Sequence, residues 1–313
     1  MSGDVELPRG LALAWGVAAT PQRGPKREMS VERIVEAAIE IADAEGLGAV
    51  SMAAVAARLG YTPMSLYRYV NAKDDLVLLM QEEATGLPSD ELRAQADWRE
   101  GLEALCREQL QSYVAHPWML DIPISGSPAT PHSSAWMDVG LHLLSRTPLS
   151  HTERLAVVLL VTGHARWAGT VLAGYARAQD ASGLMDAEVA KREDALYREL
   201  ISADAYPDLR AAIDAGVFLD DTDPFAFGLR RSLDGVAAYI EARRAGAAAE
   251  PPAALAVHAA DDLDIASDRR YREARKRVRE AEKLLREARR AERQAAREAR
   301  ERTGRDDASN SHT

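Results

Sequence analysis

The 313-residue chain is poor in aromatic residues and contains a single cysteine. Aromatic residues make up 5% of the chain while Ala runs are frequent, and this composition favours helices over sheets. A lone cysteine, Cys106, excludes an internal disulfide and fits a reducing cytoplasm. Cys106 lies in a helical pattern with Leu102, Leu105 and Leu110, which indicates a small core residue rather than a redox switch.

The sequence also lacks the motifs of the common enzyme classes. It contains no glycine-rich phosphate loop, no His-Glu-x-x-His metal motif and no paired-cysteine site. Its seven histidines include no closely spaced pair, so their spacing requires no metal, although a chelating ligand could bring one. We therefore expect a protein that is not an enzyme and that carries no cofactor.

No export or membrane-spanning segment is predicted. The apolar run at residues 11–19 follows Asp4 and Glu6 instead of basic residues, and it is too short to cross a bilayer. It either packs on the body of the protein or stays mobile. We expect a cytoplasmic protein with one small and one medium domain, because 47% of the residues are hydrophobic and can form a sizeable core.

Residues 50–73 predict two short helices joined by a tight turn. Ser51 is a suitable N-cap for the first helix, and Gly60 supplies the left-handed conformation that ends it. Thr62 can cap the second helix, and Pro63 fits its first position, where no backbone N–H is needed. Two helices in this arrangement place the end of the second one in a DNA major groove.

The second short helix is predicted to carry hydrogen-bonding side chains on its outer face. Leu66 and Val70 are four residues apart and face inward. Hydroxyl and guanidinium groups, which suit phosphates and base edges, occupy positions where an ordinary surface helix carries Glu and Lys. These outer positions are Ser65, Tyr67, Arg68 and Tyr69. A helical hairpin that binds no nucleic acid is the alternative.

A longer helix upstream completes a three-helix unit. Ser30 is its candidate N-cap, and Gly46 follows its last turn. Ahead of this helix lies a basic, turn-rich arm that could cross a phosphate backbone or enter a minor groove. The arm carries Arg23, Lys26 and Arg27.

Four strings carry a resemblance to a known family. They are Ile34-Val-Glu-Ala-Ala, Ala44-Glu-Gly-Leu, Val55-Ala-Ala-Arg-Leu-Gly, and Leu66-Tyr-Arg-Tyr-Val-Asn-Ala-Lys-Asp-Asp-Leu76. Together they closely resemble the TetR family of bacterial repressors over about residues 25–80. The last string is the most specific of the four.

The resemblance implies roles for individual residues. By this resemblance Pro63, Met64 and Ser65 read bases, Tyr67 and Tyr69 hold phosphates, and Lys73 contacts the DNA backbone. The predicted DNA contacts also include Ser51, Thr62 and Arg68. The chain departs from the tetracycline repressors at Ala53, where they carry an Arg that contacts a base, so we expect a different operator.

Residues 76–244 are predicted to form a larger helical domain for ligand binding and dimerisation. The segment 152–178 is apolar nearly all round, which indicates burial on more than one side. The order of the helices resembles the tetracycline-repressor type of C-terminal domain, whose last two long helices form a four-helix bundle across a twofold axis. The expected helices are 98–116, 135–145, 152–178, 186–202, 207–215 and 223–244.

Polar, aromatic and Met residues of the apolar segments are candidates for a ligand pocket. Aromatic and Met side chains with a few polar groups suit a planar or hydrophobic effector. The alternative is plain core packing, with His164 bonded to a backbone carbonyl. The candidate residues are Trp118, Met119, Asp121, Trp136, Met137, His164, Trp167 and Tyr175.

The C-terminal part is predicted to be a charged helix over residues 267–303. An arm at 1–24, a linker at 245–266 and disordered residues 304–313 complete the organisation. Residues 268–305 carry a net charge of +8, so the remainder of this −10 chain carries −18. Because the seam of the tail is mostly Ala, a strong coiled coil is not expected. A solvated single helix, a weak dimer zipper and a nonspecific nucleic-acid arm remain open.

The sequence therefore predicts an all-α, ligand-responsive transcriptional regulator. It would act as a repressor that binds a palindromic DNA operator as a homodimer and is released by a small hydrophobic effector. The alternative is a sequence-nonspecific DNA-binding protein whose large domain only dimerises and whose basic tail dominates affinity. Residues 23–73 carry a net charge of only +1, so specific binding must depend on where the basic residues are placed.

Overall fold

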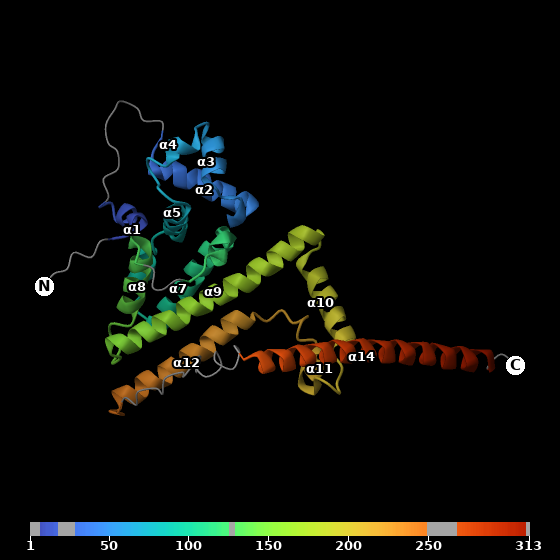
Figure 1. The fold of residues 1–313 in the computed structure, drawn as a ribbon. Coiled ribbons are helices and arrows are strands. Elements are labelled where there is room, and N and C mark those ends of the chain that lie inside the picture. The colour runs from blue at the N-terminus through green and yellow to red at the C-terminus, as the bar shows by residue number, and fades with distance from the viewer. Residues whose placement is uncertain (1–6, 18–28, 125–128, 249–267, 311–313) are drawn as a thin grey trace. The chain divides into compact units, whose positions relative to one another are not determined.

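A computed structural model describes residues 7–17, 29–124, 129–248 and 268–310 (Figure 1). All regular structure in these ranges is helical, which confirms the predicted all-α class with a helix-turn-helix region, a larger helical domain and a charged C-terminal helix. Contacts divide the chain into two units, residues 1–249 and residues 250–313.

The helix-turn-helix region begins with α2 (Val31–Glu45), which Ser30 caps through a 3.3 Å hydrogen bond from the Arg33 N–H. Helix α3 (Met52–Leu59) is capped in the same way, because the Ser51 hydroxyl accepts from the Ala54 N–H at 3.1 Å. Both predicted caps are confirmed. The turn after α3 is also confirmed, since Gly60 adopts φ 77° and ψ 28°, a left-handed conformation that favours glycine.

Helix α4 (Pro63–Leu66) is short, and a turn continues it toward α5 (Lys73–Thr85). The predicted capping role of Thr62 is wrong in its detail. Thr62 precedes α4, but no backbone N–H donates to its side chain, and its hydroxyl lies 2.9 Å from that of Ser65. The two hydroxyls satisfy each other, so the start of α4 depends on the fixed φ of Pro63.

The core under these helices is shared with the larger domain. Leu66 and Val70 are fully buried as predicted. Trp118 and Met119, from the short helix η2 (Pro117–Asp121), belong to the same hydrophobic cluster. The boundary predicted at residues 75 and 76 also falls inside α5. The helix-turn-helix region is therefore packed directly onto the rest of the unit.

A short helix, α1 (Arg9–Ala14), precedes the helix-turn-helix and packs against α5. Gly10 permits this close approach, because a Cβ there would lie 2.8 Å from Asp75 Oδ1. The Trp15 indole N–H donates to the Ala129 carbonyl at 2.7 Å. Within the apolar run at 11–19, Leu13 and Ala14 pack on the hydrophobic cluster, residues 15–17 are exposed, and residues 18 and 19 lie outside the described residues.

The larger domain contains every helix expected over residues 98–244, with bounds close to those predicted. Two short elements, α6 and η2, were not predicted, because five residues are too few to show a helical period. The elements are α6 (Asp90–Ala94), α7 (Trp98–Ala115), η2, α8 (Pro131–Leu143), α9 (His151–Ser182), α10 (Asp186–Leu200), α11 (Pro207–Asp214) and α12 (Pro224–Arg244).

Helix α9 is the long central element, and it packs against α7, α8 and α12 (Figure 1). A full capping box formed by Ser150 and Glu153 starts it. Gly140 of α8 allows a tight crossing, because a Cβ there would lie 2.8 Å from Val158 Cγ2. Leu233 and Ile240 of α12 complete the second hydrophobic cluster of this unit.

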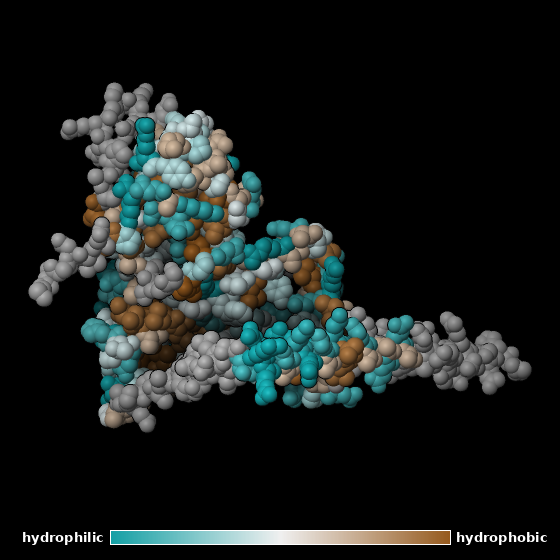
Figure 2. All heavy atoms as spheres, viewed as in Figure 1, coloured by the Kyte–Doolittle hydropathy of each residue, from teal (hydrophilic) through white to brown (hydrophobic). Residues whose placement is uncertain are grey.

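Only one side of α9 is covered within a single chain, whereas burial on more than one side was expected. Val161 is fully buried, but Leu160 is 46% and Trp167 61% exposed. By length and composition α9 could cross a membrane, yet a core helix passes the same test, and α9 packs on three helices. Hydrophobic residues accordingly gather over α9 on the face seen in Figure 2.

In the part of the second unit that the structure describes, residues 268–310 form one long helix, α14 (Arg269–Asn310). It extends seven residues beyond the predicted end at 303, so residues 304–310 are helical and not disordered. Extending an existing helix needs no new nucleation, which explains the difference. Ion pairs four residues apart, such as Arg269–Glu273 at 3.2 Å, support the interpretation of a solvated single helix.

Candidate nucleic-acid interface and ligand cavities

Helix α4 presents an apolar side chain directly to solvent. Met64, in its first turn, is 72% exposed, and Pro63 beside it is also exposed. Ser65 is half-buried, and its hydroxyl is held by Thr62. An exposed methionine flanked by ordered hydroxyls forms a surface that can contact both thymine methyl groups and base-edge hydrogen-bonding groups. These are the residues for which base contacts were predicted.

The residues predicted to hold phosphates follow α4 in the chain. Tyr67 and Arg68 are exposed, whereas Tyr69 is half-buried and packs against the hydrophobic cluster. Lys73, at the first position of α5, is exposed. Ser51 is exposed too, and its hydroxyl, which already accepts the capping bond, keeps its own hydrogen to donate. Except for the half-buried Tyr69, these donors are therefore accessible to solvent.

The basic arm with Arg23, Lys26 and Arg27 lies outside the described residues, so its role remains a prediction. Sequence reasoning did not single out Arg9 of α1. In the orientation that satisfies both of its partners, the Asn71 amide donates to the Tyr67 carbonyl at 3.1 Å and accepts from Arg9 Nε at 3.0 Å. Helix α1 therefore braces the chain just after α4, a contact that no local motif indicates.

A carboxylate of α2 connects the DNA-binding region to η2. Asp43 Oδ1 lies 2.8 Å from His116 Nδ1 and accepts from the Trp118 indole N–H at 2.7 Å. Trp118 is 2% exposed and Met119 beside it is also buried. The two residues, predicted as ligand contacts, thus pack between α2 and the larger domain.

The remaining ligand candidates lie in different environments. Trp136 is buried, and its indole N–H donates to the Gly86 carbonyl at 3.0 Å. Asp121 is exposed, Met137 is half-buried and Trp167 is largely exposed. Among the eight candidates only His164 and Tyr175 line a described cavity, and the two cavities differ. The structure does not bring the eight residues together in one pocket.

The smaller cavity lies between α7, α9 and the start of α12 and measures about 180 Å³. His164 Nε2 lies 2.9 Å from the Phe225 carbonyl, which is the backbone contact considered as the alternative for this residue. Cys106 lines the same cavity, and burial raises the pKa of its thiol to about 11. The neutral, buried thiol agrees with its interpretation as a core residue.

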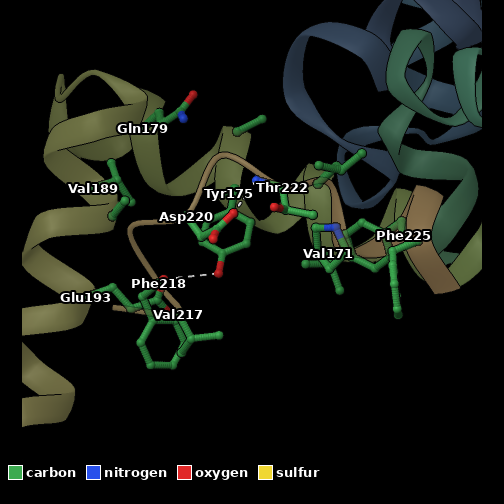
Figure 3. Close-up of a pocket in the computed structure, with 15 residues that line it drawn as sticks. Val171, Tyr175, Gln179, Val189, Glu193, Val217, Phe218, Asp220, Thr222 and Phe225 are labelled. Carbon is green, nitrogen blue, oxygen red and sulfur yellow. Dashed lines mark hydrogen bonds between the residues drawn. The ribbon is translucent and has the colours of Figure 1, made fainter. Parts of the chain in front are cut away.

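The larger cavity, here named the distal cavity, lies between the C-terminal half of α9, α10 and the segment 217–227 (Figure 3). It measures about 940 Å³. The Tyr175 hydroxyl donates to Glu193 Oε2 at 3.0 Å across it. Its lining residues are Val171, Leu172, Tyr175, Ala176, Gln179, Val189, Ala190, Glu193, Val217, Phe218, Asp220, Thr222, Pro224, Phe225 and Phe227.

Sequence reasoning missed all of the distal cavity except Tyr175, although one compositional signal was available. The chain has only three phenylalanines. They are Phe218, Phe225 and Phe227, and all three line this cavity. The grouping of all three phenylalanines within ten residues could have indicated an aromatic surface at residues 218–227.

Comparison with known proteins identifies both parts of the first unit. Residues 34–80 match the family model described as bacterial regulatory proteins, tetR family, and residues 92–240 match that of the tetracyclin repressor-like C-terminal domain. A curated relative, the HTH-type transcriptional repressor DrrR1 of Streptomyces coeruleorubidus, is 36% identical over 78% of this chain and 90% of its own length. The chain belongs to the TetR family. It is a DNA-binding transcriptional regulator and not an enzyme.

Other relatives of this TetR-family regulator are more distant. A transcriptional regulator of Saccharopolyspora erythraea is 27% identical over 46% of this chain and 61% of its own length. The fold is similar to apo ActR of Streptomyces coelicolor, with TM-score 0.56 and 23% identity over 69% of this chain and 99% of ActR. ActR in complex with actinorhodin gives TM-score 0.55 and 22% identity, with coverage of 69% and 97%. At this identity the similarity establishes the fold.

Proposed function

We propose that this TetR-family regulator is a cytoplasmic repressor that binds a palindromic operator as a homodimer and releases it when a small hydrophobic effector binds. The observation that carries the proposal is the exposed surface of α4, where Met64 is 72% exposed and the donors Tyr67, Arg68 and Lys73, which follow it in the chain, are exposed as well. Related proteins support it, because DrrR1 is named a repressor and ActR has been solved with actinorhodin.

Selection of bound sequences from random duplex DNA tests the DNA part of the proposal. We expect one palindromic sequence to be enriched. Tyr67→Phe and Lys73→Ala should weaken binding to every sequence and Lys73→Ala should also lower the salt dependence, because phosphate contacts carry no sequence information. Met64→Ala should instead change the preferred bases. Equal affinity for all sequences would favour the nonspecific binder whose basic tail dominates.

The homodimer is supported by the uncovered apolar side of α9, which a second copy would bury. We expect light scattering to give a dimer mass for the full chain and a monomer mass for Leu160→Arg. Leu284→Arg in α14 is the matched control, since Leu284 is also exposed, at 65%. If only Leu284→Arg dissociates the dimer, the C-terminal helix holds the two copies together and the α9 assignment is wrong.

A further inference from the structure

We propose that the distal cavity binds a flat aromatic cation. Binding of this cation requires neither DNA nor a dimer. Only the further step, that the bound cation is the effector, rests on the proposed function. Of the predicted pocket residues only Tyr175 lines this cavity, and the comparisons do not assign it. A volume of about 940 Å³ lies in the range of sites that hold drug-sized molecules.

The shape and lining of the cavity call for a planar ligand. Phe218, Phe225 and Phe227 all line it, and Figure 3 shows Tyr175 of α9 between Phe218 and Phe225. Phe218 is held in place by stacking on Tyr197, with ring centroids 4.5 Å apart and an interplanar angle of 14°. Rings fixed in this manner offer faces and edges to another aromatic ring at little entropic cost.

The charges around the cavity select the sign of the ligand. Glu193 and Asp220 are both lining residues, and the fifteen residues that line the cavity include no Lys, Arg or His. The Thr222 N–H donates to Asp220 Oδ1 at 2.7 Å, and the hydrogen bonds from Thr222 lower the pKa of this carboxyl, so it is ionised near neutral pH. An anionic ligand would be repelled here, whereas a cation would be attracted.

One of these rings already accepts a positive charge. The Arg231 guanidinium lies 5.6 Å from the centroid of the Phe227 ring, outside the lining set, while it also pairs with Asp234 at 2.9 Å. The contact shows that the Phe227 ring accepts a cation, and it occupies the ring face that Arg231 covers. Arg198 of α10 is not a lining residue, and it is paired with Asp194 at 2.6 Å and with Asp214 at 3.1 Å.

A matched pair of dyes tests the proposal on the full chain without DNA. We use 9-aminoacridine, a cation at pH 7, and acridine, which has the same ring system but is neutral. Fluorescence titration should show that the cation binds about tenfold more tightly than acridine. Glu193→Gln and Asp220→Asn should each reduce affinity for 9-aminoacridine about threefold to tenfold and leave acridine affinity unchanged. The control is Glu241→Gln, which removes a carboxylate on α12 that does not line the cavity.

Other results would overturn the assignment. Equal affinities for the two dyes in the wild type would remove the role of charge. Unchanged 9-aminoacridine binding in both carboxylate variants and in Phe227→Ser would place the dye elsewhere. Affinity that falls as protein concentration rises would mean that a second copy covers the cavity. Failure of dye binding leaves an operator preference intact, and absence of an operator preference leaves dye binding intact, so the two proposals fail separately.

Discussion

Replacement of Asp43 by Ala removes the acceptor that joins α2 to η2, and its cost can be estimated from the structure. The variant leaves the Trp118 indole N–H, in a side chain only 2% exposed, without its partner. A buried donor that loses its partner costs about 1–3 kcal/mol. The hydrogen bond with His116 contributes about 1 kcal/mol more. Because the Asp43 side chain is partly exposed, we expect a total near 2–3 kcal/mol.

Urea unfolding followed by circular dichroism measures this change in the free energy of unfolding. We expect Asp43→Ala to lower the midpoint at unchanged slope, which indicates a loss of stability and not a change in compactness. The matched control is Glu36→Ala, which removes an exposed carboxylate from the same helix. We expect the control to change stability by less than about 0.5 kcal/mol.

A double-mutant cycle locates the effect. Trp118→Phe removes the same indole hydrogen bond while it keeps an aromatic ring in the core. The combined loss in Asp43→Ala with Trp118→Phe should therefore be smaller than the sum of the single losses. Additive losses, or an Asp43→Ala variant as stable as the Glu36→Ala control, would refute the view that this carboxylate couples the DNA-binding region to the larger domain.

Three further predictions follow from packing and titration. Gly140→Val should lower stability by about 1–3 kcal/mol, measured by thermal unfolding, because its side chain would collide with Val158; an unchanged melting temperature would contradict this. Hydrogen bonds, of which that from Tyr239 has the largest effect, lower the pKa of Glu153 to about 2. The ionised Glu153 therefore contributes its full stabilisation above about pH 4.5, and this stabilisation is lost as the pH falls toward 2. The melting temperatures of wild type and Glu153→Gln should therefore converge as the pH is lowered from 7 to 4 and 3. A difference in melting temperature that stays the same at all three pH values would contradict this prediction. Cys106 should react with a thiol reagent at pH 8 only after unfolding, because burial raises its pKa to about 11, and rapid labelling of the native protein would contradict that pKa.

The sequence predicted the helix-turn-helix well because its signals are local. Ser51 caps α3 by accepting from the N–H three residues ahead, and Gly60 provides the left-handed turn that ends this helix. Leu66 and Val70 are spaced by one helical turn. Each of these interactions joins residues that are at most four apart, so periodicity and capping rules suffice to find them. Thr62 differs because its hydroxyl could bond either to a backbone N–H of α4 or to the Ser65 hydroxyl, and in the structure it bonds to Ser65.

The predicted ligand residues fared differently because their surroundings are set by distant parts of the chain. Aromatic and Met residues at helical spacing identify apolar faces, but they do not tell which element covers them. Trp118 packs against α2, and the Trp136 indole N–H donates to the carbonyl of Gly86, which follows α5. Trp167, by contrast, remains largely exposed. The same residue type can therefore be core, interdomain contact or surface.

The sequence by itself determined the helical class, the main helices to within a few residues, the capped helix-turn-helix and the family, because all of these depend on short-range patterns. Only the tertiary structure decided that Asp43 joins Trp118 across 75 positions, that α1 packs on α5, and that three phenylalanines and two carboxylates surround one cavity. These arrangements arise from packing between helices that are distant in the chain, and the periodicity of each segment shows which face packs but not which partner covers it.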